Sequence, residues 1–279
     1  MKTILLIVLQ VVMLFSLQAQ TAEEWLIKGD SALSSAYKVE CYTKALELRP
    51  NFTDAYFKRG KTMAGLEAYD MAIDDFTSTI CFKFDHAEAY YFRGIVKLEM
   101  GKEKDAIKDF DKAIQLNPEY DLAYSARGKA KRIVKRYQES LLDYNKAISI
   151  NPNEVTFYTG RGILKGDMNE FEQALEDFNE ALWLNPKNAS SYYGRGSIYL
   201  ILNNYQKAIE DYTSAIELGS TKTLYVFYFY RGYAYERLGQ FETAIQEFKQ
   251  SLALKSDYED AKKHLEYCQL KLLPQLTRN

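Results

Sequence analysis

The chain contains 279 residues, of which 47% are hydrophobic, 27% are charged and only five are proline. This composition is typical of a folded, largely helical protein and excludes a disordered chain. Its 36 basic and 38 acidic residues give a formal net charge of −2, so the sequence lacks the positive charge that indicates a nucleic-acid partner.

A basic end and an apolar run form the N-terminus. Lys2 precedes residues 4–17, which are apolar except for Gln10 and Ser16, and the small residue Ala19 follows. The run is too short to cross a bilayer comfortably, and the pattern is typical of a secretory signal peptide at 1–19. A lipoprotein signal would need a cysteine at the cleavage site, and none is present. We therefore predict a periplasmic or extracellular protein with no membrane span after cleavage; an uncleaved anchor is the alternative.

One pattern occurs seven times between Trp25 and Lys255. In six copies an arginine-glycine pair follows a tyrosine, and the glycines from Gly60 to Gly196 are spaced by 34 residues. A fixed period of this size indicates a solenoid, in which each unit buries its apolar face against its neighbours. The predicted units are residues 22–52, 53–86, 87–120, 121–154, 155–188, 189–222 and 225–258.

Each unit is predicted to be a helix, a tight turn and a second helix, because apolar residues recur at three- and four-residue spacing in both halves. In the third unit Gly101 marks the end of the first helix, and Pro118 marks the end of the second. A glycine inside the first helix, such as Gly94, predicts a close crossing by the partner helix. The turn of the first unit is about three residues shorter than the others. Residues 259–273 are predicted to form a capping helix within a C-terminal segment, 259–279.

These units resemble tetratricopeptide repeats. The resemblance rests on three further columns of the second helix: a small residue, an aromatic residue four positions later and another small residue three beyond it. It implies an all-α solenoid, a right-handed superhelix of about seven helix pairs plus a cap, that binds other proteins. The columns are Ala72, Ala106, Ser140, Ala174, Ala208 and Ala244; Phe76, Phe110, Tyr144, Phe178, Tyr212 and Phe248; and Thr79, Ala113, Ala147, Ala181, Ala215 and Ser251.

An acid stands sixteen residues after the arginine of each arginine-glycine pair. The family usually has leucine at this arginine position, so the column needs its own explanation. A planar guanidinium suits a partly buried carboxylate. Because every arginine has its acid, a structural bridge between helices is favoured over an anionic-ligand site on each repeat. The predicted pairs, the charge ladder, are Arg59 with Asp75, Arg93 with Asp109, Arg127 with Asp143, Arg161 with Asp177, Arg195 with Asp211, and Arg231 with Glu247.

The resemblance implies that the first helices line a concave groove. The residues around each arginine-glycine pair are aromatic and aliphatic with a few cations, and we predict that they contact the partner. Family members that hold chaperone C-termini use a two-carboxylate clamp of Lys, Asn and Arg, and no three consecutive units here supply that set. The predicted groove residues are Phe57, Tyr91, Ile95, Leu98, Lys129, Arg132, Ile163, Tyr193, Leu200, Phe229 and Tyr233.

Residues 225–230 form the most aromatic segment of the chain. Local propensity favours a strand there, but the period places the segment in the first helix of the seventh unit. Phe227 and Tyr228 fall on core columns, which leaves Phe229 and Tyr230 free to face the groove or the neighbouring turn. An exposed aromatic cluster of this kind indicates a partner site.

No residues suggest catalysis, metal binding or a cofactor. The two histidines, His86 and His264, have no partner at a useful spacing, and the three cysteines, Cys41, Cys81 and Cys268, lie far apart. We therefore predict an exported, non-enzymatic adaptor that captures a peptide segment or helix of another protein in its groove. The alternative is a permanent structural subunit of an envelope complex, assembled through the convex face or the ends. The sequence leaves the partner's identity and the oligomeric state open.

Overall fold

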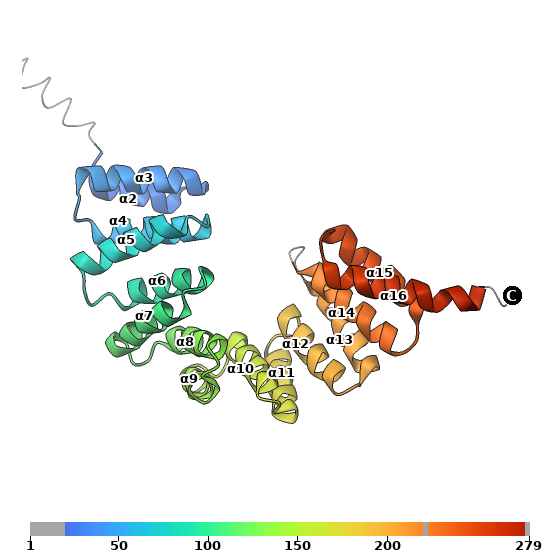
Figure 1. The fold of residues 1–279 in the computed structure, drawn as a ribbon. Coiled ribbons are helices and arrows are strands. Elements are labelled where there is room, and N and C mark those ends of the chain that lie inside the picture. The colour runs from blue at the N-terminus through green and yellow to red at the C-terminus, as the bar shows by residue number, and fades with distance from the viewer. Residues whose placement is uncertain (1–19, 220–222, 277–279) are drawn as a thin grey trace, which may run out of the picture. The chain divides into compact units, whose positions relative to one another are not determined.

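The computed structural model of the chain describes residues 20–219 and 223–276 (Figure 1). These residues form fifteen helices and no strand, which confirms the predicted all-α class. The predicted signal peptide at 1–19 lies outside the described residues. Within the described part, no helix combines the length and apolar character that a bilayer crossing requires.

The chain divides into two compact units, residues 1–134 and residues 135–279. In the first unit every helix contacts the next, and the first helices of neighbouring pairs, such as α4 and α6, also touch. The helices are α2 (Ala22–Ser31), α3 (Ser35–Leu48), α4 (Thr53–Gly65), α5 (Tyr69–Phe82), α6 (Ala87–Glu99), α7 (Glu103–Leu116) and α8 (Asp121–Ile133).

The second unit has the same neighbour-to-neighbour packing and ends in a longer helix, α16. Residues 225–230 are helical within α14, as the repeat period predicts and local propensity does not. The helices are α9 (Tyr137–Ile150), α10 (Val155–Asp167), α11 (Phe171–Leu184), α12 (Ala189–Ile201), α13 (Tyr205–Leu218), α14 (Leu224–Arg237), α15 (Phe241–Leu254) and α16 (Glu259–Leu276).

Apart from the first pair, the turn inside each helix pair is a left-handed helix cap. In the second repeat Glu67 has φ of 60°, and the N–H of Ala68 donates to the Met63 carbonyl at 2.9 Å. These two features define a Schellman cap, which ends a helix by satisfying its last carbonyls. The left-handed residue recurs at the same register in six turns: Glu67, Gly101, Lys135, Asn169, Asn203 and Gly239.

The aromatic column of the second helices forms the core. A Cβ added to Gly94 would lie 2.6 Å from Phe110 Cε1, so the first helix crosses the ring too closely for any side chain. This confirms the predicted close crossing. All six rings of the column are at most 3% exposed: Phe76, Phe110, Tyr144, Phe178, Tyr212 and Phe248.

The first pair differs from the others because α2 has only ten residues, whereas α4, α6, α8, α10 and α12 each have thirteen. The chain leaves α2 at Ala32 in an extended conformation, with φ of −69° and ψ of 139°. The left-handed cap of the other pairs is absent from this turn. About one helical turn is therefore missing from the end of α2.

Helix α16 packs against the last repeat. Ala261 and Cys268 are fully buried on it, and Leu265 and Leu272 join them in one cluster with Phe248 of α15. The predicted apolar face of the terminal helix thus covers the open side of α15. Cys41, Cys81 and Cys268 are all free thiols.

Candidate peptide-binding surface

Arginines of the first helices form two-bond ion pairs with acids of the second helices. Arg59 on α4 donates from Nε to Asp75 Oδ2 at 2.9 Å and from Nη2 to Asp75 Oδ1 at 2.8 Å. The guanidinium fork matches the two carboxylate oxygens, which a lysine ammonium cannot do. The same geometry, with N–O distances from 2.6 to 3.0 Å, occurs in Arg93–Asp109, Arg161–Asp177, Arg195–Asp211 and Arg231–Glu247.

The remaining predicted pair is Arg127 on α8 with Asp143 on α9. Arg127 Nη1 donates to Asp111 Oδ1 at 2.6 Å. Asp143 is 4% exposed.

Each ladder arginine makes a further contact, with a polar residue of the preceding repeat, that the pairing with its acid does not predict. Arg59 Nη1 donates to Thr43 Oγ1 on α3, the second helix of the preceding repeat, at 3.1 Å. The arginine therefore connects three helices, and the polar residue sixteen positions before most of these arginines was the available signal. The corresponding acceptors of the other arginines are Thr77, Asp111, Asn145, Asn179 and Thr213.

Asp109 and Asp177 of the ladder also accept a lysine. Lys97 Nζ lies 2.6 Å from Asp109 Oδ2, and Lys165 Nζ lies 2.8 Å from Asp177 Oδ2. Each lysine stands four residues after a ladder arginine, which places both cations on one side of the first helix. This spacing could have been found in the sequence.

Burial is the main electrostatic influence on Asp211. It raises the pKa of this carboxyl, against the opposing effect of the hydrogen bonds from Arg195. The hydrogen bond to Asp211 in turn raises the pKa of Arg195. Since Nε and both terminal nitrogens of Arg195 already donate within the protein, the geometry supports a structural interpretation of the ladder.

In the compact unit formed by residues 1–134, the predicted groove residues Phe57, Tyr91 and Ile95 are half-buried. Phe92, which was not predicted, connects two of them: its ring centroid lies 5.7 Å from that of Phe57 and 5.1 Å from that of Tyr91. Lys61 Nζ lies 4.7 Å from the Phe92 ring centroid. These side chains form a continuous aromatic surface with a cation at its edge.

Leu98 does not belong to this surface, so its assignment to the groove is wrong. It is 7% exposed and packs against Ile107 and Phe110 in the core, because its helix register faces α7. The remaining predicted residues of the unit are on α8, where Lys129 is exposed and Arg132 is half-buried.

In the second unit, Tyr193 is the centre of the predicted surface. Its ring centroid lies 5.1 Å from that of Phe227 and 5.8 Å from that of Tyr230. Burial raises the pKa of Tyr193, yet the side chain stays partly open to solvent. Of the other predicted residues here, Ile163 is exposed, and Leu200 and Tyr233 are half-buried.

The prediction that Phe229 faces the groove is wrong. The side chain is 7% exposed, and its ring lies 5.8 Å from Phe248, 5.0 Å from Tyr258 and 5.6 Å from His264, between centroids. The last repeat has α16 as its neighbour in place of another repeat, and this helix covers the position. Tyr230, in contrast, is half-buried.

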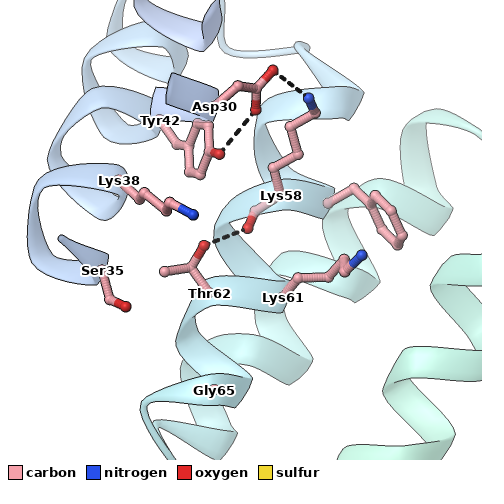
Figure 2. Close-up of a pocket in the computed structure, with 9 residues that line it drawn as sticks. Asp30, Ser35, Lys38, Tyr42, Lys58, Lys61, Thr62 and Gly65 are labelled. Atoms are coloured by element: carbon pink, nitrogen blue, oxygen red, sulfur yellow. Dashed lines mark hydrogen bonds and ion pairs between the residues drawn. The ribbon is translucent and has the colours of Figure 1, made fainter. Parts of the chain in front are cut away.

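A pocket of about 530 Å³ opens beside the first repeat (Figure 2). Asp30 accepts hydrogen bonds from the Tyr42 hydroxyl, at 3.0 Å, and from Lys58 Nζ. In the close-up the amino group of Lys38 points toward the middle of this space. The lining residues are Asp30, Ser35, Lys38, Tyr42, Phe57, Lys58, Lys61, Thr62 and Gly65.

Histidine, glutamate and cysteine meet where α16 packs on α14. His264 Nδ1 lies 2.7 Å from Glu236 Oε2, and Cys268 Sγ donates to the same oxygen at 3.6 Å. Burial, assisted by Glu236, raises the pKa of Cys268 to about 12, so the sulfur stays a protonated thiol and is a poor nucleophile. Among the described residues, no group of histidine, cysteine, aspartate and glutamate is suited to hold a metal ion.

Comparison with solved structures shows the fold. A tetratricopeptide repeat protein from Parabacteroides merdae is 19% identical, with a TM-score of 0.73, over 90% of this chain and 100% of its own. PilF of Pseudomonas aeruginosa is 17% identical, with a TM-score of 0.64, over 76% and 95%. YrrB, described as a TPR protein with an unusual peptide-binding site, is 22% identical, with a TM-score of 0.51, over 64% and 93%.

Family models give the same result from the sequence. Models described as tetratricopeptide repeats match residues 87–120, 122–154, 189–221 and 226–258, and one described as a TPR repeat matches 166–200. A search of curated proteins gave no match. Since the matched segments together span more than half of the chain and four of the five coincide with its helix pairs, the chain belongs to the tetratricopeptide repeat family.

Proposed function

We propose that this protein is exported and captures a peptide segment or helix of another protein on its first helices. Tetratricopeptide repeats indicate a scaffold for protein–protein interaction. The single observation that carries the proposal is the pair of partly open rings Tyr193 and Tyr230, with Tyr193 packed beside the buried Phe227. Large aromatic residues of this kind supply most of the binding energy at protein interfaces.

The charge ladder indicates that its arginines are not the residues that contact the partner. Its arginines are the strongest potential anchors on the first helices, but their donors already bind acids and polar residues of the protein. A partner therefore meets aromatic and aliphatic side chains for the most part. Binding should consequently depend on apolar contact and respond only modestly to added salt.

The second candidate, a structural subunit that assembles through second helices, is favoured by one observation. Trp183 on α11 is 75% exposed, and Leu142 on α9 is 68% exposed. Large apolar side chains that remain exposed in one protein can be covered by another. The test must therefore compare a first-helix site with a second-helix site.

Tyr193→Ala should weaken partner binding by about tenfold or more, because truncation of a central aromatic anchor commonly costs about 2 kcal/mol. The partner would first be captured by the purified protein from its own envelope fraction and identified by mass spectrometry. Affinity of that partner would then be measured by calorimetry, with circular dichroism to check the fold.

Two matched variants complete the design. Tyr193→Phe keeps the ring and its packing against Phe227, so it should bind nearly as well as the parent. Trp183→Ala should leave affinity unchanged. If Trp183→Ala abolishes binding while Tyr193→Ala does not, the structural-subunit candidate replaces peptide capture.

A further inference from the structure

The pocket beside the first repeat lies where the missing turn of α2 would be. Helix α2 contributes only Asp30 to its lining, while α3 contributes Ser35, Lys38 and Tyr42, and α4 contributes its last turns up to Gly65. In the later repeats the first helix runs thirteen or fourteen residues and ends in a left-handed cap, but α2 stops after ten. The short α2 accounts for this opening, which we call the short-turn pocket.

Positive charge predominates in the short-turn pocket. Three lysines line it, Lys38, Lys58 and Lys61, against the single carboxylate of Asp30. Asp30 is already paired with Lys58 and hydrogen-bonded to Tyr42 (Figure 2). The backbone N–H of Lys38 donates to the Ser34 carbonyl at 2.9 Å, but within the part of the chain that the structure describes its side-chain ammonium group makes no hydrogen bond or ion pair.

Lys38 and Lys61, the two pocket lysines that are not paired with Asp30, differ in position. Lys38 points toward the middle of the pocket in Figure 2. Lys61 lies at the edge, where its Nζ is 5.6 Å from the Phe57 ring centroid and 4.7 Å from that of Phe92. An anion in the pocket would therefore meet one ammonium group inside and a second at the start of the aromatic surface.

We propose that the short-turn pocket binds an aspartate or glutamate side chain of the captured peptide segment. The proposal rests on the proposed function, because the carboxylate must be carried by a segment lying along the first helices. Lysine ammonium groups attract a carboxylate as point charges, while the Phe57 ring offers apolar contact to the neighbouring peptide residue. Phosphopeptide sites are typically built from arginine clusters, and the ladder arginine of α4, Arg59, is engaged with Asp75. The carboxylate is thus the favoured anion.

The test uses two labelled peptides that differ only in charge, Phe-Glu-Ala-Glu-Phe amide and Phe-Gln-Ala-Gln-Phe amide. Fluorescence anisotropy would measure their affinity for the purified protein. The glutamate peptide should bind more tightly by about fivefold or more, a difference expected of a partly desolvated charge pair. Lys38→Gln should remove this preference. Lys104→Gln, which changes an exposed lysine of α7 in the same unit, should keep it.

Gly65 allows a second test that does not depend on removing a lysine. A Cβ added there meets no atom within 4 Å, so a longer side chain can be accommodated. Gly65→Glu places a tethered carboxylate at the pocket and should abolish the preference for the glutamate peptide. Gly65→Gln has nearly the same size without charge and should retain most of it.

Specific results would overturn the proposal. It fails if the parent binds the two peptides equally or binds neither. It also fails if Lys38→Gln and Gly65→Glu leave the preference intact, or if inorganic phosphate displaces the glutamate peptide far better than acetate does, which would identify a phosphate site. Peptide capture itself would still stand if both peptides bind and Tyr193→Ala weakens partner binding. Loss of the partner interaction at second-helix variants alone would instead remove the proposed function.

Discussion

Each ladder arginine connects two adjacent repeats through one side chain. Arg195 on α12 bonds Asp211 on α13 at 2.7 and 2.9 Å and Asn179 on α11 at 2.7 Å. Leucine, the usual family residue at this position, could fill the space but could not fix the register of three helices. Burial nevertheless raises the pKa of Asp211, so desolvation opposes the charged form even beside its partner. The pair therefore contributes more to specificity than to net stability.

Asp211→Ala should destabilise the local structure by about 3–5 kcal/mol, because Arg195 would remain half-buried without its acid. Replacing both residues, Arg195→Met with Asp211→Leu, should cost much less. Hydrogen exchange of the α12 and α13 amides is the suitable measurement, since repeat arrays do not unfold in one step.

Asp177 provides a stricter comparison. Two cations, Arg161 and Lys165, bind this acid. Asp177→Ala should therefore cost more than Asp211→Ala, and the double replacement of Arg161 and Asp177 should remain costly because Lys165 stays without an acid. Equal losses in the single and double variants at Arg195 and Asp211 would contradict the ladder interpretation.

At the scale of single residues, the sequence predicted the arginine–acid pairs of the ladder but not every side-chain contact. A constant sixteen-residue separation was sufficient for five two-bond pairs, because each first helix always meets its own second helix. The burial of Phe229 was not predictable in the same way. Its column is partly open in repeats that face another repeat, as at Tyr193, but α16 covers it in the last one. A periodic pattern cannot show what a non-repeating neighbour does.

The elements depend on their turns, and six turns place a left-handed residue at one register. Two of these residues are glycine, two are asparagine, and the others are Glu67 and Lys135. Glycine takes this conformation without strain, whereas a residue with a Cβ is disfavoured in it. The end of the helix is therefore predictable from the glycine at Gly101. At Glu67 the residue type does not predict it, and only the repeat period indicates the turn.

Glu67→Gly should stabilise the pair α4 and α5 by about 0.5–1 kcal/mol, because it relieves the left-handed strain by more than it increases the entropy of the unfolded chain. Gly101→Ala should have the opposite effect, a loss of about 1 kcal/mol in the pair α6 and α7. Hydrogen exchange of the turn amides and urea titration would measure both. Destabilisation by Glu67→Gly would show that the glutamate side chain contributes something that the cap geometry does not explain.

At the scale of the molecule, contacts stay local. Within each unit a helix touches its successor and, among first helices, the next pair. A change in one repeat should therefore propagate little beyond its neighbours. The number of helix pairs and the terminal helix followed from the period and the apolar pattern. The short-turn pocket did not, because a shortened turn in the sequence does not reveal whether side chains fill the space or leave it open.

The last expectation concerns export of the whole chain. Residues 4–17 form an apolar run behind Lys2, and a small residue, Ala19, stands at the expected cleavage point. Intact-mass measurement of the protein from its own envelope fraction should therefore give a chain that begins at or near Gln20. A variant with Val11→Arg and Leu14→Arg should instead accumulate unprocessed in the cytosol, because charges in the apolar run prevent its recognition and insertion. Detection of Met1 on a membrane-bound form of the unaltered protein would support the uncleaved anchor, and the partner should then be sought at the membrane surface.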